Sequence, residues 1–246
     1  MTDKSTARSN QFGQPIGPEV EGWTARERPT REPMQGRYCR LEGVDPARHA
    51  ADLFAAYMAA PDGRDWTYLF ADRPADAAAF RAYLDKAAAS ADPLHYTIVD
   101  LAAGGGKGAA LGTAALMRIE PVHGVIEVGT ITYSPALKQT RAGTEAMYLM
   151  MKRSFDELGY RRYEWKCDSL NAPSRAAAKR YGFEYEGIFR QAIVYKGRNR
   201  DTAWFAITDR EWPRVRSAFE AWLAPENFDS GGRQKRALAE IRAGLG

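Results

Sequence analysis

Cysteine and histidine are scarce in this chain, and it has no long apolar segment. The 246 residues include two cysteines, Cys39 and Cys167, and three histidines. Without a CxxC pair these residues do not make a convincing metal site, so no metal is expected. Both cysteines lie in strand-like runs, which predicts reduced thiols in the core. The apolar runs fall far short of the ~20 residues that a membrane-spanning helix needs.

No secretory leader is expected, and the sequence has no strong charge bias. Residues 1–5 lack the apolar core of a signal peptide, and this predicts a cytoplasmic protein without membrane attachment. The 35 Lys and Arg residues stand against 31 Asp and Glu residues, a net charge of +4. That excess is too small to indicate a nucleic-acid partner, although it suits an anionic ligand such as a phosphate-bearing cofactor.

The composition that is present, 45% hydrophobic and 27% charged, is that of an ordinary globular protein. We expect three parts. Residues 1–35 are rich in proline and charge and form an extended arm over the surface. Residues 36–224 form one domain. Residues 225–246 form a C-terminal tail, helical in part, that is an appendage to the domain.

The pattern of apolar residues predicts a mixed α/β fold with a central sheet. Asp45 is expected to cap a helix that has Pro46 at its first position, and Gly159 is expected to end another. The predicted helices cover residues 46–58, 74–91, 142–158 and 173–181, with one more after residue 209. The predicted strands cover residues 38–42, 94–101, 110–121, 125–133, 163–168, 183–195 and 202–208.

The turn between the strand over 125–133 and the next helix carries small and basic residues. A helix N-terminus presents unpaired N–H groups and a partial positive charge, which favour a phosphate group. Small residues would let a pyrophosphate approach the backbone. The alternative is a plain helix start capped by Thr144, with Lys138 and Arg141 in solvent. The residues predicted to bind a cofactor here are Leu137, Lys138, Gln139, Arg141, Ala142, Gly143 and Thr144.

The residues that follow are similar to a known family. Asn171-x-x-Ser174, a helix, Gly182-Phe183, Glu186-Gly187 and Arg190 resemble the acyl-CoA-binding core of the GNAT N-acetyltransferases. The subgroup they most resemble is the ribosomal-protein N-terminal acetyltransferases, and the resemblance covers roughly residues 38–208. It implies a mostly antiparallel sheet of about six or seven strands, splayed in the middle, with helices on both faces.

The resemblance also implies the reaction and its partners. An acetyl group would pass from acetyl-CoA to a primary amine, on a protein N-terminus or a small molecule, by direct attack. The enzyme would be a monomer or homodimer. Alternatives are another donor such as succinyl-CoA, with Arg190 facing the acyl tip, and a CoA-binding module without turnover.

The chain departs from the family at two places. The turn usually reads Gln/Arg-x-x-Gly-x-Gly/Ala, and here Ala142 and Thr144 replace the two glycines. The tyrosine that often protonates the departing thiolate is replaced by Ala178. By resemblance Ser174 inherits that role, and the Asn171 amide binds the pantetheine arm. Helix capping also explains both residues without any ligand.

Glu127 is the one acidic residue inside the otherwise apolar central strand. Burial between Ile126 and Val128 would make it a better proton acceptor and a candidate general base. The alternative is an exposed carboxylate paired with an arginine. Gly129 would permit a bulge that splays the strand and frees a backbone N–H for the thioester oxygen.

Two further segments are candidates for substrate or phosphate binding. Trp66 and Tyr68 follow the first helix, where family members wall the acceptor site, although both residues would also suit the core. Residues 104–108, Gly-Gly-Gly-Lys-Gly, suggest a phosphate loop but lack its Ser or Thr. A flexible turn between two strands explains them.

Overall fold

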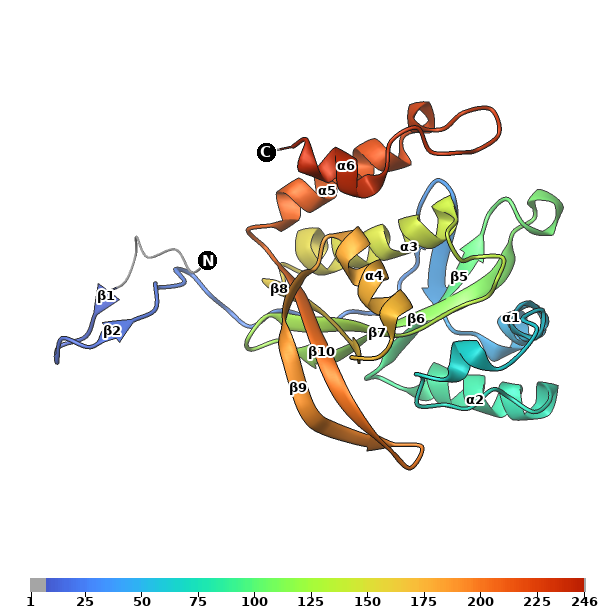
Figure 1. The fold of residues 1–246 in the computed structure, drawn as a ribbon, viewed down its shortest axis with the longest axis horizontal. Helices are drawn as coiled ribbons and strands as arrows, with labels where there is room; N and C mark the ends of the chain where they lie inside the picture. Colours follow the sequence, from blue (N-terminus) through green and yellow to red (C-terminus); the bar gives the residue numbers. More distant parts are fainter. Residues whose placement is uncertain (1–7, 246) are drawn as a thin grey trace.

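An eight-stranded sheet forms the centre of the computed structural model, which describes residues 8–245 (Figure 1). Its order is β3-β4-β5-β6-β7-β8-β10-β9, and only β7 and β8 run parallel. The predicted mixed α/β class is confirmed. The strands are β3 (Met34–Gln35), β4 (Cys39–Gly43), β5 (Leu94–Asp100), β6 (Ala109–Glu120), β7 (Val125–Tyr133), β8 (Arg162–Asp168), β9 (Glu184–Tyr195) and β10 (Arg198–Thr208).

Strands β7 and β8 pair over their first halves only. Their register begins at Val125 with Arg162 and ends at Val128 with Trp165, although both strands continue. Beyond this point, no described residue of β8 pairs with β7. The sheet is therefore splayed in its middle, as the resemblance implies.

A bulge in β7 accompanies the splay. Between the pairs Ala115–Gly129 and Thr113–Thr132, β7 has one more residue than β6. Thr130 takes up the extra length with a φ of 46°. Bulges bend and twist a strand, so the bulge predicted at Gly129 is present, with Thr130 as its left-handed residue.

Most helices cover one face of the sheet, which we call the α3 face. Alternate residues of β7 and β8, among them Ile126 and Trp165, point to this face and join the main core. Helix α3 continues through a π-helical turn to Glu157, and Gly159 at φ 68° ends it. The helices are α3 (Arg141–Lys152), α4 (Ala172–Tyr181), α5 (Trp212–Leu223) and α6 (Leu238–Ala243).

The opposite face, the α1 face, carries helices α1 (Pro46–Met58) and α2 (Ala77–Ala89) (Figure 1). They enclose a smaller core that contains Leu53, Phe80 and Leu84. The Tyr57 hydroxyl donates a 3.0 Å hydrogen bond to the carbonyl of Thr132 in β7. These contacts fix α1 against the strands beside the splay.

Capping residues decide where the helices begin. Asp45 accepts hydrogen bonds from the first turn of α1, and the predicted span of this helix is confirmed. Helix α2 begins at Ala77 rather than residue 74, because Asp76 caps it by accepting from the backbone N–H of Ala79. Asp and Asn favour such positions because their oxygens satisfy unpaired N–H groups.

The N-terminal segment contacts the domain at the β6–β7 turn and at Tyr160, just before β8. Residues 1–7 of the predicted arm lie outside the described part. Trp23 Nε1 donates to the carbonyl of Val122, and Tyr160 donates to that of Glu27. Strands β1 (Arg8–Ser9) and β2 (Pro15–Ile16) form a small hairpin that projects from the domain (Figure 1).

The C-terminal segment is packed more closely than predicted. Leu238 and Ile241 of α6 are buried in the main core, and Arg242 donates to the carbonyls of Lys179 and Arg180 in α4. The description of this segment as an appendage is therefore wrong: its apolar residues complete the layer over α4 and α5. Gly246 lies outside the described residues.

Three smaller expectations concern the cysteines, the glycine run and the membrane. Both cysteines are free and buried, and burial raises the pKa of the Cys39 thiol. Residues 104–106 form a short turn between β5 and β6, as predicted. Within residues 8–245, no helix combines the length and apolar character needed to span a bilayer.

Candidate active site at the splay

The two predicted proton-transfer residues lie on opposite faces of the sheet at the splay. Val128 and Trp165 form the last pair of β7 and β8 and share the α3 face. Ser174 Oγ accepts a 3.0 Å hydrogen bond from the indole Nε1 of Trp165. Glu127, one residue before Val128, points to the α1 face because successive strand residues alternate. Glu127 and Ser174 therefore lie beside the splay on opposite sides of the sheet.

Glu127 is buried and ion-paired. Glu127 is 3% exposed, and its Oε2 lies 2.8 Å from Arg118 Nη1 and 2.9 Å from Lys166 Nζ. Each interpretation of the sequence is met in part, since the carboxylate is buried rather than exposed but does pair with an arginine. The carboxylate is enclosed, as a general base would be, and it is paired with an arginine, as a structural residue would be.

Lys166 links Glu127 to a second buried carboxylate. Its Nζ lies 2.6 Å from Glu164 Oε2 and 3.8 Å from the centre of the Trp204 ring. Glu164 also accepts from Arg162, which reaches Glu186 on β9. The α1 face beside the splay therefore carries a charged network that crosses four strands.

Asn171 and Ser174 have the helix-capping contacts expected of them. Asn171 Oδ1 accepts from the backbone N–H of Ser174 at 3.1 Å and caps α4. No described residue accepts a hydrogen bond from Asn171 Nδ2. Tyr181 is buried against Trp165 and Phe219, which confirms its expected packing role, and burial raises its pKa.

The turn before α3 is shaped by a glycine and a threonine. A Cβ at Gly143 would lie 2.6 Å from the carbonyl oxygen of Leu137, so only glycine fits this close approach. Thr140, rather than Thr144, caps the helix by accepting from Gly143 N. Gln139 has a φ of 59°, and Leu137 and Ala142 are buried.

The polar residues of this turn differ in whether their side chains already have a partner. Lys138 Nζ pairs with Asp65 at 2.5 Å, and Arg141 stacks on Tyr38 and Phe228 rather than lying in solvent. Thr144 is buried and accepts from Arg180. The hydroxyls of Thr130 and Ser134, at this end of β7, are buried without a described partner.

Trp66 and Tyr68 lie on the loop between α1 and α2. Trp66 is buried and packs edge-on against Tyr57 with centroids 5.8 Å apart. Tyr68 donates a 3.2 Å hydrogen bond to the carbonyl of Leu170, beside Asn171. The loop therefore reaches the start of α4 through Tyr68 and packs on α1 through Trp66.

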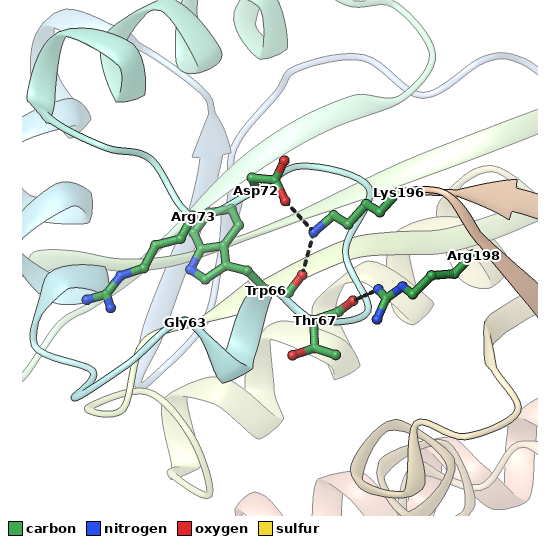
Figure 2. Close-up of a pocket in the computed structure, with 7 residues that line it drawn as sticks. All are labelled: Gly63, Trp66, Thr67, Asp72, Arg73, Lys196 and Arg198. Atoms are coloured by element: carbon green, nitrogen blue, oxygen red, sulfur yellow. Dashed lines mark hydrogen bonds and ion pairs between the residues drawn. The ribbon is translucent and has the colours of Figure 1, made fainter.

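The tip of the β9–β10 hairpin holds the same loop. Lys196 Nζ donates to the carbonyl of Trp66 and pairs with Asp72, and Arg198 donates to the carbonyl of Thr67 (Figure 2). A cavity of about 580 Å³ lies between loop and hairpin, away from Glu127 and Ser174. It is lined by Gly63, Trp66, Thr67, Asp72, Arg73, Lys196 and Arg198.

Comparison with known proteins places the chain in a family. Residues 40–184 match the acetyltransferase (GNAT) domain, and this span is more than half of the chain. The chain belongs to the GNAT acetyltransferase family. It is therefore an acetyltransferase with the GNAT fold. Among curated proteins, none matches the sequence.

Solved structures agree with this assignment. A GCN5-related N-acetyltransferase from Brucella melitensis is 50% identical, with a TM-score of 0.88 over 91% of this chain and 100% of that one. A GNAT-family acetyltransferase from Chromobacterium violaceum is 40% identical, with a TM-score of 0.73 over 81% and 98%.

A more distant structure carries information about the fold alone. It is an acetyltransferase from Salmonella typhimurium that modifies the N-terminal serine of a 50S ribosomal subunit protein. It is 17% identical, with a TM-score of 0.59 over 72% of this chain and 99% of that one.

This GNAT acetyltransferase contains site features that the sequence did not reveal. Glu164 and Lys166 lie in a strand whose alternation was recognised, but the register that sets them beside Glu127 is a property of the sheet. Arg190 is exposed on β9 beside Gln191, and no described contact joins it to Ser174 or Asn171.

Proposed function

We propose that this enzyme transfers the acetyl group of acetyl-CoA to a primary amine, with the thioester at the splay between β7 and β8. The observation that carries the proposal is the end of pairing at Val128 and Trp165, with Ser174 on one face and Glu127 on the other. A thioester in that gap would be accessible to an amine from the α1 face.

The acyl donor would enter from the α3 face. The turn over 137–144 fits a pyrophosphate because the N–H groups of Arg141 and Ala142 have no described acceptor, and Gly143 keeps the backbone close. Asn171 Nδ2 would bind the pantetheine arm. Lys138 would contribute charge once it leaves Asp65. The backbone N–H groups after Val128, unpaired on the β8 side, would stabilise the thioester oxygen.

Protons would move at two residues. Glu127 would accept the proton of the attacking ammonium, directly or through water, because its carboxyl group lies beside the splay, between Arg118 and Lys166. Ser174 Oγ, which accepts from Trp165, would donate its own proton to the departing thiolate and take one back from water. No covalent enzyme intermediate is needed.

The placement of the donor is tested by Asn171→Ala. Calorimetric titration with acetyl-CoA should show affinity lowered by about two- to thirteen-fold, the value of one neutral hydrogen bond. Asn171→Asp retains the capping oxygen but replaces the Nδ2 donor with a charged acceptor, so it should weaken binding at least as much while preserving the helix. Unchanged affinity in both variants would overturn the placement.

A further inference from the structure

Strand β10 carries three enclosed donor atoms that no residue in the described part of the chain satisfies. They are Arg200 Nε, Thr202 Oγ1 and Trp204 Nε1. Arg200 is 6% exposed and Thr202 3% exposed. Buried polar groups in proteins are nearly always paired. A row of such donors on one strand offers hydrogen bonds to a ligand that supplies acceptor atoms.

Arg200 is the charged member of this row, and aromatic rings hold it in place. Its guanidinium carbon lies 5.5 Å from the centre of the Phe70 ring and 5.9 Å from that of Tyr195. Contacts with ring faces leave the in-plane N–H edge of a guanidinium free, and that edge matches a carboxylate. Phe70 belongs to the α1–α2 loop and is 55% exposed.

No described carboxylate lies within ion-pair distance of Arg200, although Asp168 lies nearby. Asp168, nearby on β8, accepts from the Tyr195 hydroxyl at 2.7 Å and from the backbone N–H of Leu170. Asp201, the next residue, accepts from Gln191 N and from the Asn199 amide. A buried charge without a counter-ion is costly. Proteins retain such costs mainly at functional sites.

The three donors lie along β10, from the proposed reaction centre outwards. Trp204 pairs in register with Lys166, whose Nζ contacts Glu127. Arg200 lies four residues further along β10, roughly 13 Å at about 3.3 Å per residue. Thr202 lies between them. An extended molecule with its amine at Glu127 would therefore bring its other end to Arg200.

We propose that the amine acceptor carries a carboxylate that Arg200 binds, with carbonyl groups in between that accept from Thr202 and Trp204. This proposal rests on the proposed acetyl transfer and specifies its substrate class. Short peptides and long amino acids with a free carboxyl group fit this description. Arg200 is then a specificity residue, separate from the groups that move protons.

The test compares acceptors that differ only in the carboxylate. Glycine, diglycine, triglycine and tetraglycine are each assayed as free acid and as C-terminal amide by release of CoA thiol. At the best length the free acid should have a kcat/KM at least tenfold above the amide. Arg200→Gln should remove this preference through KM, by about ten- to a hundred-fold. Arg200→Lys should restore part of it. Arg210→Gln, which removes an exposed arginine just beyond β10, should leave it intact.

Two measurements separate this proposal from the proposed function. If no peptide is acetylated, calorimetry with the N-acetylated products still tests the site, and binding that Arg200→Gln abolishes supports it. Thermal unfolding should show Arg200→Gln as stable as the wild type or more so, because an unpaired buried charge is removed. Equal turnover and equal binding of acids and amides by the wild type would overturn the proposal. A destabilised Arg200→Gln with unchanged selectivity would also overturn it.

Discussion

The two faces of the sheet at the splay are built in different ways. On the α3 face the polar groups beside the splay are mostly satisfied by near neighbours in the chain: Asn171 caps α4 and Thr140 caps α3. On the α1 face they come from different strands, and they form either a buried ionic network around Lys166 or, at Arg200, no ion pair within residues 8–245.

On the α3 face the proposed binding groups belong to short sequence motifs. On the α1 face the fold brings such groups together from separate strands. The α3 face uses helix starts, whose N–H groups suit any phosphate-bearing acyl donor. The α1 face places charges at fixed positions in a low-dielectric environment, where we expect them to discriminate among acceptors. The donor side should therefore be common to relatives, and the acceptor side should decide specificity.

The largest expected effect follows from removing the proposed base. Glu127→Gln should lower kcat at neutral pH by about a hundred- to ten-thousand-fold, the usual contribution of a positioned base. It should also abolish the acidic limb of the pH–rate profile. The measurement is steady-state kinetics across pH on protein whose folding is checked by circular dichroism.

Glu164→Gln is the matched control for Glu127. Glu164 is also buried and also contacts Lys166, but it lies on β8 rather than beside the bulge. It should retain most of the activity and the acidic limb. Equal losses in the two variants would mean that Glu127 acts through the ionic network alone.

The proposed acid on the α3 face should show the next largest effect. Ser174→Ala should lower kcat by about ten- to a thousand-fold and destabilise the domain by only ~1 kcal/mol, since the hydroxyl is not the helix cap. Trp165→Phe removes the indole donor that contacts Ser174 and should lower kcat far less. A Ser174→Ala protein that is slightly less stable but fully active would assign the proton to water.

Disruption of the ionic network should affect stability. Lys166→Met should lower the free energy of unfolding by about 1.5–3 kcal/mol, the value of hydrogen bonds to charged groups. The loss of stability is limited because Glu127 keeps its ion pair with Arg118 and Glu164 keeps its ion pair with Arg162. Urea unfolding measures it. Arg118→Met should cost less, because the Arg118 side chain is 43% exposed, and a reversed order would contradict this description of the α1 face.

The smallest effect concerns the edge of the same network. The Arg162 guanidinium, 2.8 Å from Glu186, holds the pKa of that carboxyl below its ordinary value. The contribution of this pair to stability is therefore complete above about pH 4.3 and is lost as pH falls through the lower, folded pKa. It should not exceed ~1 kcal/mol, since Glu186 is partly exposed. Urea unfolding near pH 6 and near pH 3 should show a smaller acid loss in Glu186→Gln than in the wild type; identical losses would contradict it.

The features that the sequence predicts, and those that it does not, divide in the same way between the two faces. The span of α1 and the start of α4 depend on Asp45 and Asn171, whose capping oxygens act within a few residues. The alternation of apolar residues predicts the strands, and Glu127 is recognisable as an acid in an apolar run. The position of Arg200 was not predictable, because Phe70 and Tyr195 meet it only after the hairpin has folded against the α1–α2 loop.

A crystal structure with bound CoA tests the central claim most directly. We predict the pyrophosphate on the turn over 137–144, the pantetheine arm beside Asn171, and the sulfur at the splay near Ser174, all on the α3 face. The sulfur should be separated from Glu127 only by the gap after Val128. CoA in the cavity between the α1–α2 loop and the hairpin tip, or a sulfur remote from the splay, would contradict the account.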